Sequence, residues 1–129
     1  MVVADTNVWA RAILNDDVSQ SPKARKAIAA ARSKSGIFVP LIVIVELAWV
    51  LRRRLGREGV LASVEDLRHG DGVIVESPAL VDEAITASRS GNGGFADQLL
   101  GLVGLANGAT EVITFDEKFA RSAYVRQLK

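Results

Sequence analysis

Four carboxylates in this 129-residue chain stand in surroundings that would not by themselves attract a charge. Asp5 follows the apolar run VVA, and Asp116 follows the run VITF, so each acid comes where a buried strand is expected to end. Glu46 and Asp97 each interrupt an apolar helical pattern. Because a buried, unpaired carboxylate is costly or becomes protonated, these four acids need a common explanation.

A shared divalent cation is the explanation that fits the chemistry. Carboxylates that share a pocket repel one another unless a cation neutralises them, and hard oxygen ligands suit Mg²⁺ or Mn²⁺. The chain has no cysteine, and its one histidine, His69, lies in a polar stretch expected to end a helix. Thiolate sites, histidine-rich zinc sites and histidine-dependent triads are therefore disfavoured. We expect one or two Mg²⁺ or Mn²⁺ ions as the cofactor.

Short apolar runs alternate with helical patterns along the chain. We expect strands at 2–4, 36–40, 72–76 and 111–115, and helices at 7–14, from Ser21 onward, at 42–55, 57–68, 77–90 and 95–107, with a short helix and a tail at the end. This alternation predicts the α/β class, with right-handed crossovers and a parallel sheet. The carboxyl ends of parallel strands lie at one edge, where the following helices begin. The four acids are therefore predicted to converge there.

The segment 41–55 is the most ambiguous part of this assignment. Its first half, LIVIV, favours a strand by intrinsic propensity. Its second half, ELAWVLRRRL, favours a helix that carries arginines in its last turn and stops at Gly56. We expect a helix, because Pro40 would interrupt a central strand.

The composition is that of one globular domain spanning residues 1–129. Apolar residues make up 49% and charged residues 24% of the chain. The mean hydropathy of +0.21 is high and indicates a buried parallel sheet or an apolar surface covered by a partner. The longest apolar stretch contains Pro40 and Glu46 and is shorter than the roughly 20 residues of a membrane-spanning helix. With no signal-peptide pattern, we expect a cytoplasmic protein without membrane association.

Four motifs, taken together, resemble those of a known family. The stretches VVADTNVW, VPLIVIVELAWVL, GNGGFADQLL and VITFDEKFA follow the order and spacing of the PIN-domain nucleases, most closely the VapC-like toxins of bacterial toxin–antitoxin pairs. The resemblance covers nearly the whole chain and implies a single-domain, three-layer α/β/α sandwich around a short parallel sheet. It implies that the catalytic and metal-binding residues are Asp5, Glu46, Asp97 and Asp116, supported through hydrogen bonds by Thr6, Asn7 and Thr114.

The resemblance also implies an activity and a set of partners. The family is similar in cleaving RNA with Mg²⁺ or Mn²⁺, in forming homodimers and in being inhibited by a cognate antitoxin. We therefore expect a metal-dependent ribonuclease that is the toxin of such a pair. Many relatives carry an acid just before the phenylalanine that corresponds to Phe119, where this chain has Lys118. Glu117 lies one residue earlier, and its role stays open.

Basic residues supply candidate contacts to RNA or to an antitoxin. Since the net charge is only +1, affinity for nucleic acid must depend on where the charges lie. The candidates are Arg11, Arg52, Arg53, Arg54 and Arg57, together with the basic group on the helix from Lys23 to Arg32. The arginines of LRRRLGR equally suit a solvated helix end that complements the helix dipole, and both interpretations stay open.

Other functions fit parts of the pattern. A housekeeping PIN-domain RNA-processing nuclease is the main alternative, and the sequence does not separate it from a toxin. An inactive PIN-fold binding module is disfavoured because all four acids are present. A signalling receiver domain needs an adjacent acidic pair after the first strand, and a dehalogenase-type phosphatase needs an aspartate where Asn7 stands. Both are disfavoured.

Overall fold

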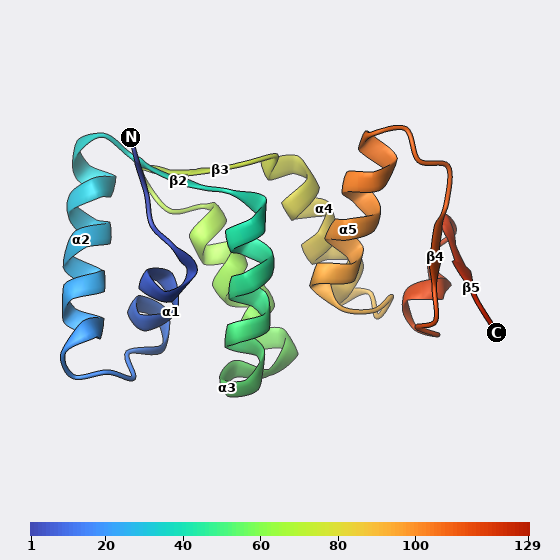
Figure 1. Cartoon of the computed structure of the whole chain (residues 1–129), viewed down its shortest axis with the longest axis horizontal. Helices are drawn as coiled ribbons and strands as arrows, with labels where there is room; N and C mark the ends of the chain where they lie inside the picture. Colours follow the sequence, from blue (N-terminus) through green and yellow to red (C-terminus); the bar gives the residue numbers. More distant parts are fainter. The chain divides into compact units, whose positions relative to one another are not determined.

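The structure, a computed structural model, describes all 129 residues and contains two compact units. Unit 1 comprises Met1–Ser77 and unit 2 comprises Pro78–Lys129 (Figure 1). Each unit is described by itself, since their relative placement is not determined. No helix in either unit has the length and apolar character needed to cross a membrane.

Unit 1 is built on a three-stranded parallel sheet with the order β1-β2-β3 (Figure 1). The strands are β1 (Val2–Val3), β2 (Ile37–Val39) and β3 (Val73–Val75). Ile37 and Val39 of the central strand are fully buried. The prediction that the first strand is buried is wrong, because β1 pairs only with β2 and leaves Val2 and Val3 exposed.

Three helices complete unit 1, namely α1 (Thr6–Leu14), α2 (Gln20–Lys34) and α3 (Leu41–Arg68). Helix α1 packs against both α2 and α3. The helical interpretation of the ambiguous segment 41–55 is confirmed. The apolar residues of α3 form much of the core: Val43, Ile44, Leu47, Leu51, Leu61 and Val64. Gly56 interrupts α3 with a φ of 69°, so the predicted stop between two helices is also confirmed.

The start of α2 differs from the prediction. The helix begins at Gln20, and its first amides are capped by Asp17, whose Oδ1 accepts hydrogen bonds from the amides of Ser19 (2.9 Å) and Gln20 (2.7 Å). These bonds, chiefly that from Gln20, hold the pKa of Asp17 below its ordinary value. Ser21, where the helix was predicted to begin, is instead buried within it and accepts a hydrogen bond from the amide of Asp17. An aspartate side chain therefore caps the start of this helix.

Unit 2 pairs two helices and forms a second parallel sheet (Figure 1). Its elements are α4 (Pro78–Arg89), α5 (Phe95–Ala106), β4 (Val112–Thr114), the 3₁₀ helix η1 (Phe119–Arg121) and β5 (Val125–Gln127). The predicted helix at 77–90 is confirmed as α4. The prediction of a tail at the end of the chain is wrong for residues 125–127, which pair in parallel with β4. Its sequence, VRQ, lacks the apolar run that indicated the other strands.

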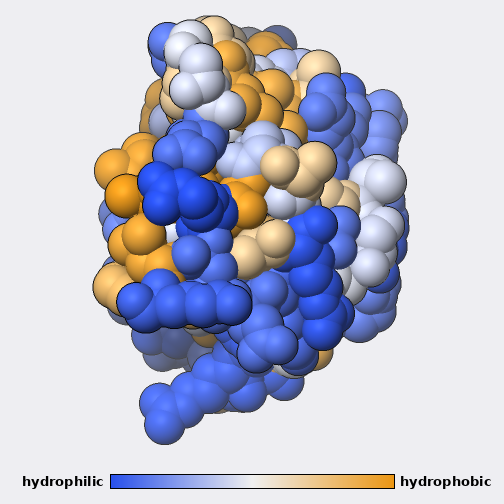
Figure 2. All heavy atoms as spheres, turned by 90° about the vertical axis from the view of Figure 1, so that its right-hand side faces the viewer, coloured by the Kyte–Doolittle hydropathy of each residue, from blue (hydrophilic) through white to orange (hydrophobic).

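Unit 2 exposes several large apolar side chains, namely Leu100, Ile113 and Phe115. Figure 2 shows apolar atoms gathered in patches among hydrophilic ones on the face that it views. These side chains contribute to the high mean hydropathy noted from the sequence. The idea that a partner covers apolar surface stays a prediction.

Candidate active site

Asp5 lies directly between β1 and α1 and caps the helix. Its backbone is extended, and its Oδ1 accepts a 3.1 Å hydrogen bond from the amide of Val8. This helix cap occupies only one of the two carboxylate oxygens of Asp5. Oδ2 has no hydrogen-bond or ion-pair partner, so it is able to accept a further ligand.

Glu46 is brought to the start of α1 by a side-chain contact. Thr6 Oγ1 donates a 3.2 Å hydrogen bond to Oε1 of Glu46, which lies on α3. Glu46 is exposed and forms no ion pair. Two of the four predicted acids thus belong to adjoining elements of unit 1, and Thr6 donates a hydrogen bond to one of them. Asn7 is also exposed, and its side chain has no hydrogen-bond partner.

Asp116 comes two residues after the end of β4. Its Oδ1 accepts a 2.9 Å hydrogen bond from the amide of Phe119, while its own amide donates to Thr114 Oγ1 at 3.0 Å. Thr114 therefore holds the backbone of Asp116 and not its carboxylate. As with Asp5, one carboxylate oxygen is used locally and Oδ2 has no partner. Glu117 and Lys118 are exposed next to it.

Asp97 lies in the first turn of α5, where a negative charge is favoured by the helix dipole. The next residue, Gln98, is 1% exposed, and sequence reasoning gave it no role. Gln98 Nε2 donates to the carbonyl of Asn92 and, at 3.0 Å, to Ser122 Oγ, while its Oε1 accepts a 3.1 Å hydrogen bond from the Tyr124 hydroxyl. This buried amide therefore ties the first turn of α5 to the glycine-rich loop and to the segment before β5.

The phenol of Tyr124 stays a donor in this network. Burial, with a smaller contribution from the charge of Glu83, raises its pKa above the ordinary value. It is therefore neutral over the physiological pH range and is able to donate its proton to Gln98. The signal that could have found Gln98 is a lone amide inside the apolar run FADQLLGLVGLA, since a buried amide is normally hydrogen-bonded.

The structure groups the predicted acids two by two, with Asp5 and Glu46 in unit 1 and Asp97 and Asp116 in unit 2. No group of three or more carboxylate or histidine side chains gathers within either unit. Convergence of all four therefore stays a prediction. The donor chemistry fits a hard cation, because Asp5 and Asp116 each keep a free oxygen and neither these acids nor Glu46 is neutralised by an ion pair.

The arginines predicted to contact RNA or an antitoxin lie in unit 1, and some of them are held by hydrogen bonds to other side chains. Arg11 donates from Nη1 to both carboxylate oxygens of Asp16, at 3.1 and 3.0 Å, and from Nε to Gln20 Oε1 at 3.0 Å. Arg54 contacts the same aspartate at 3.4 Å. The remaining members of the predicted set, Arg52, Arg53 and Arg57, are exposed on either side of Gly56. Their contact with RNA or an antitoxin stays a prediction.

Comparison with known proteins gives one family. Residues 2–123 match the PIN domain. No curated protein gives a significant match. Among solved structures, the chain is similar to VapC20 of Mycobacterium tuberculosis, described as a toxin that cleaves the sarcin–ricin loop, with 21% identity, 97% of each chain covered and a TM-score of 0.49. A similarity this loose carries no conclusion about activity.

Proposed function

Because the chain belongs to the PIN domain family, we propose that it is a metal-dependent ribonuclease and the toxin of a type II toxin–antitoxin pair. One observation carries the proposal. The family match over residues 2–123 includes all four carboxylates that stood out in the sequence, Asp5, Glu46, Asp97 and Asp116. We propose that these four acids act together at one metal site.

The proposed site would hold Mg²⁺ or Mn²⁺ through carboxylate oxygens alone. Such an ion supplies Lewis-acid activation of water and offsets negative charge on the phosphoryl oxygens. The chain's own residues hold the ligands in place. Thr6 fixes one oxygen of Glu46, and the Val8 and Phe119 amides each fix one oxygen of Asp5 and Asp116. Each carboxylate is thereby oriented before substrate binds.

Hydrolysis by this route needs no protein nucleophile. The chain contains no cysteine, and His69 is the C-cap residue of α3 rather than a neighbour of any of the four acids in sequence. We propose that water attacks the scissile phosphate and that the products are a 5′-phosphate and a 3′-hydroxyl. The exposed arginines Arg52, Arg53 and Arg57 would serve the RNA backbone or an antitoxin, and the active form would be a homodimer.

The direct test is cleavage of purified total RNA by the full chain. We expect cleavage with Mg²⁺ or Mn²⁺, none in excess EDTA, and products that carry 5′-phosphates. Failure to cleave with either metal would contradict the ribonuclease and favour a PIN-fold binding module.

A second experiment separates the toxin from a housekeeping nuclease. The chain is expressed alone and together with any small reading frame found directly upstream of its gene. A toxin should arrest growth alone and be relieved by the second product. Normal growth with protein that is active in vitro would assign a housekeeping role in RNA processing.

A further inference from the structure

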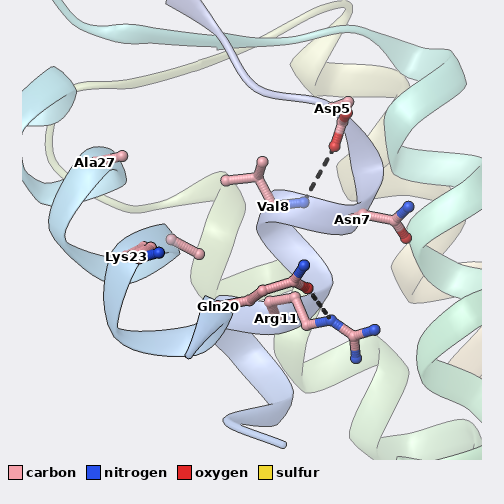
Figure 3. A pocket seen from close by; sticks show the side chains of 8 residues that line it. Asp5, Asn7, Val8, Arg11, Gln20, Lys23 and Ala27 are labelled. Atoms are coloured by element: carbon pink, nitrogen blue, oxygen red, sulfur yellow. Dashed lines mark hydrogen bonds between the residues drawn. The ribbon is translucent and has the colours of Figure 1, made fainter. Parts of the chain in front are cut away.

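A pocket of about 330 Å³ opens between α1 and α2 within unit 1 (Figure 3). Its volume lies at the lower end of the range for small-ligand sites, about 300–1,000 Å³, so it has room for one small molecule and not for a folded segment. Its lining consists of Asp5, Asn7, Val8, Arg11, Gln20, Lys23, Ala24 and Ala27. Asp5 is the only one of these residues that belongs to the four acids.

The pocket has an apolar part and a polar part. Figure 3 shows the Val8 side chain of α1 pointing toward Ala27 of α2, and Ala24 completes this apolar surface. Asp5 lies toward one end, while Gln20 and Arg11 lie toward the other (Figure 3). A flat apolar group fits against small side chains of this kind, with polar groups at its edges fixing its orientation.

The two cationic side chains that line the pocket differ in how far other groups compensate their charge. Arg11 is held by both oxygens of Asp16 and by Gln20, so much of its charge is already compensated. Lys23 is exposed and has no ion-pair partner. Lys23 is therefore the available cation of the pocket, and a lysine with a flexible stem suits a phosphate. Gln20 uses Oε1 on Arg11 and keeps its Nε2 group free to donate.

We infer that this pocket binds one nucleotide of the RNA substrate. The base rests on Val8, Ala24 and Ala27, and the phosphate attached to it contacts Lys23. An apolar surface, a free amide donor and an unpaired cation match the base face, the base edge and the phosphate of a nucleoside monophosphate. The inference rests on the proposed function, because it makes the bound nucleotide part of the substrate of a ribonuclease.

The pocket also fixes where this nucleotide lies relative to the reaction. Asp5 lines it and has a free carboxylate oxygen assigned above to the metal site. A nucleotide held in the pocket is therefore a neighbour of the scissile phosphate, and it contributes to cleavage preference at that position. Filling the apolar part should change substrate affinity and base preference without removing any of the four acids.

The first test uses nucleoside monophosphates as probes of the full chain, followed by amide chemical shifts. At least one of AMP, GMP, CMP and UMP should shift amides within residues 5–11 and 20–27. Ala27→Met should weaken that binding about tenfold, because the longer side chain fills the pocket. Ala29→Met is the matched control, since Ala29 is exposed on the same helix and does not line the pocket. Equal binding by both variants, or equal affinity for inorganic phosphate, would overturn the inference.

The second test follows RNA cleavage and separates the two proposals. Lys23→Ala should raise KM severalfold with little change in kcat and reduce the salt dependence of KM by about one phosphate contact. Lys34→Ala, at the far end of α2, should leave both parameters unchanged. Cleavage by the wild type with identical KM values for the two variants would reject the pocket and keep the nuclease. Nucleotide binding without any metal-dependent cleavage would reject the nuclease and the assignment of the nucleotide to its substrate, and would leave the pocket as a nucleotide site.

Discussion

Thr6 Oγ1 donates a 3.2 Å hydrogen bond to Oε1 of Glu46, a residue 40 positions further along the chain. The contact joins the first residue of α1 to the third helix of the unit. Thr6 follows Asp5 directly. The bond therefore connects α3, which carries Glu46, to the helix that begins just after Asp5. A hydroxyl that orients a metal-binding carboxylate affects activity without touching the metal.

Removing this hydroxyl should weaken the enzyme and spare the fold. Thr6→Val keeps the side-chain shape but cannot donate to Glu46, so we expect about a tenfold loss of RNA cleavage and a higher Mn²⁺ concentration for half-maximal rate. Thr6→Ser keeps the donor and should stay near wild type. Equal rates for the two variants would show that the bond does not orient Glu46.

Removing the buried side-chain amide of Gln98 should lower the free energy of unfolding more than removing any one of its hydrogen-bond partners. Gln98→Leu leaves the Asn92 carbonyl and the hydroxyls of Ser122 and Tyr124 without their partner, at a cost of about 2–3 kcal/mol. Tyr124→Phe removes one hydroxyl and should cost about 1 kcal/mol. Urea denaturation measures both free energies of unfolding. A Gln98→Leu protein as stable as Tyr124→Phe would contradict the role of the network.

Two glycine-to-alanine substitutions should have opposite effects on the free energy of unfolding. Gly56 has a φ of 69°, a region that alanine avoids, so Gly56→Ala should lower the free energy of unfolding by about 1–2 kcal/mol. Gly104 lies inside α5, and an added Cβ would meet only the Ala109 methyl at 3.7 Å. Gly104→Ala should therefore stabilise by about 0.5–1 kcal/mol. Thermal denaturation of the two variants would show whether their signs differ, and a neutral Gly56→Ala would contradict the account of this break.

Acid should weaken the pair of strands in unit 2. Arg126 on β5 donates to both carboxylate oxygens of Glu111, at 2.8 and 3.3 Å, and this bond, with the charge of Arg126, lowers the pKa of Glu111 from its ordinary 4.5. A carboxyl with a depressed folded pKa contributes stability above its unfolded pKa and loses it as pH falls through the folded value. Glu111→Gln should therefore be less stable than wild type at neutral pH, and the difference should shrink as pH falls below 4.5. A difference that is independent of pH would contradict this contribution.

The sequence was sufficient to predict most elements and the family. Glycine stops and long apolar runs located the helices, including the ambiguous one at 41–55, because these signals are local. It failed where tertiary context decides. The strand Val125–Gln127 exists through its pairing with β4, and Val2 is exposed because β1 has one neighbour in its sheet.

The candidate site shows the same difference between local signals, which the sequence reveals, and tertiary contacts, which it does not. Acid positions were visible as charges that interrupt apolar patterns, and Thr6 was expected beside them. The roles of Gln98 and Asp16 were not predicted, because each depends on partners 5 or more residues away. Lys23 was expected only as one of a basic group, and the pocket between helices that it lines was not predicted. Spacing alone does not show which side chain is buried or which cation is already paired.

The central claim is that four acids far apart in sequence serve one metal-dependent reaction. The most direct measurement is the rate of RNA cleavage, at saturating Mn²⁺, by Asp5→Asn, Glu46→Gln, Asp97→Asn and Asp116→Asn, with Asp66→Asn on the exposed side of α3 as control. Losing a ligand removes several kcal/mol of transition-state stabilisation, so each of the four should fall by at least about 100-fold while the control keeps the wild-type rate. Full activity in any one of the four would contradict the claim.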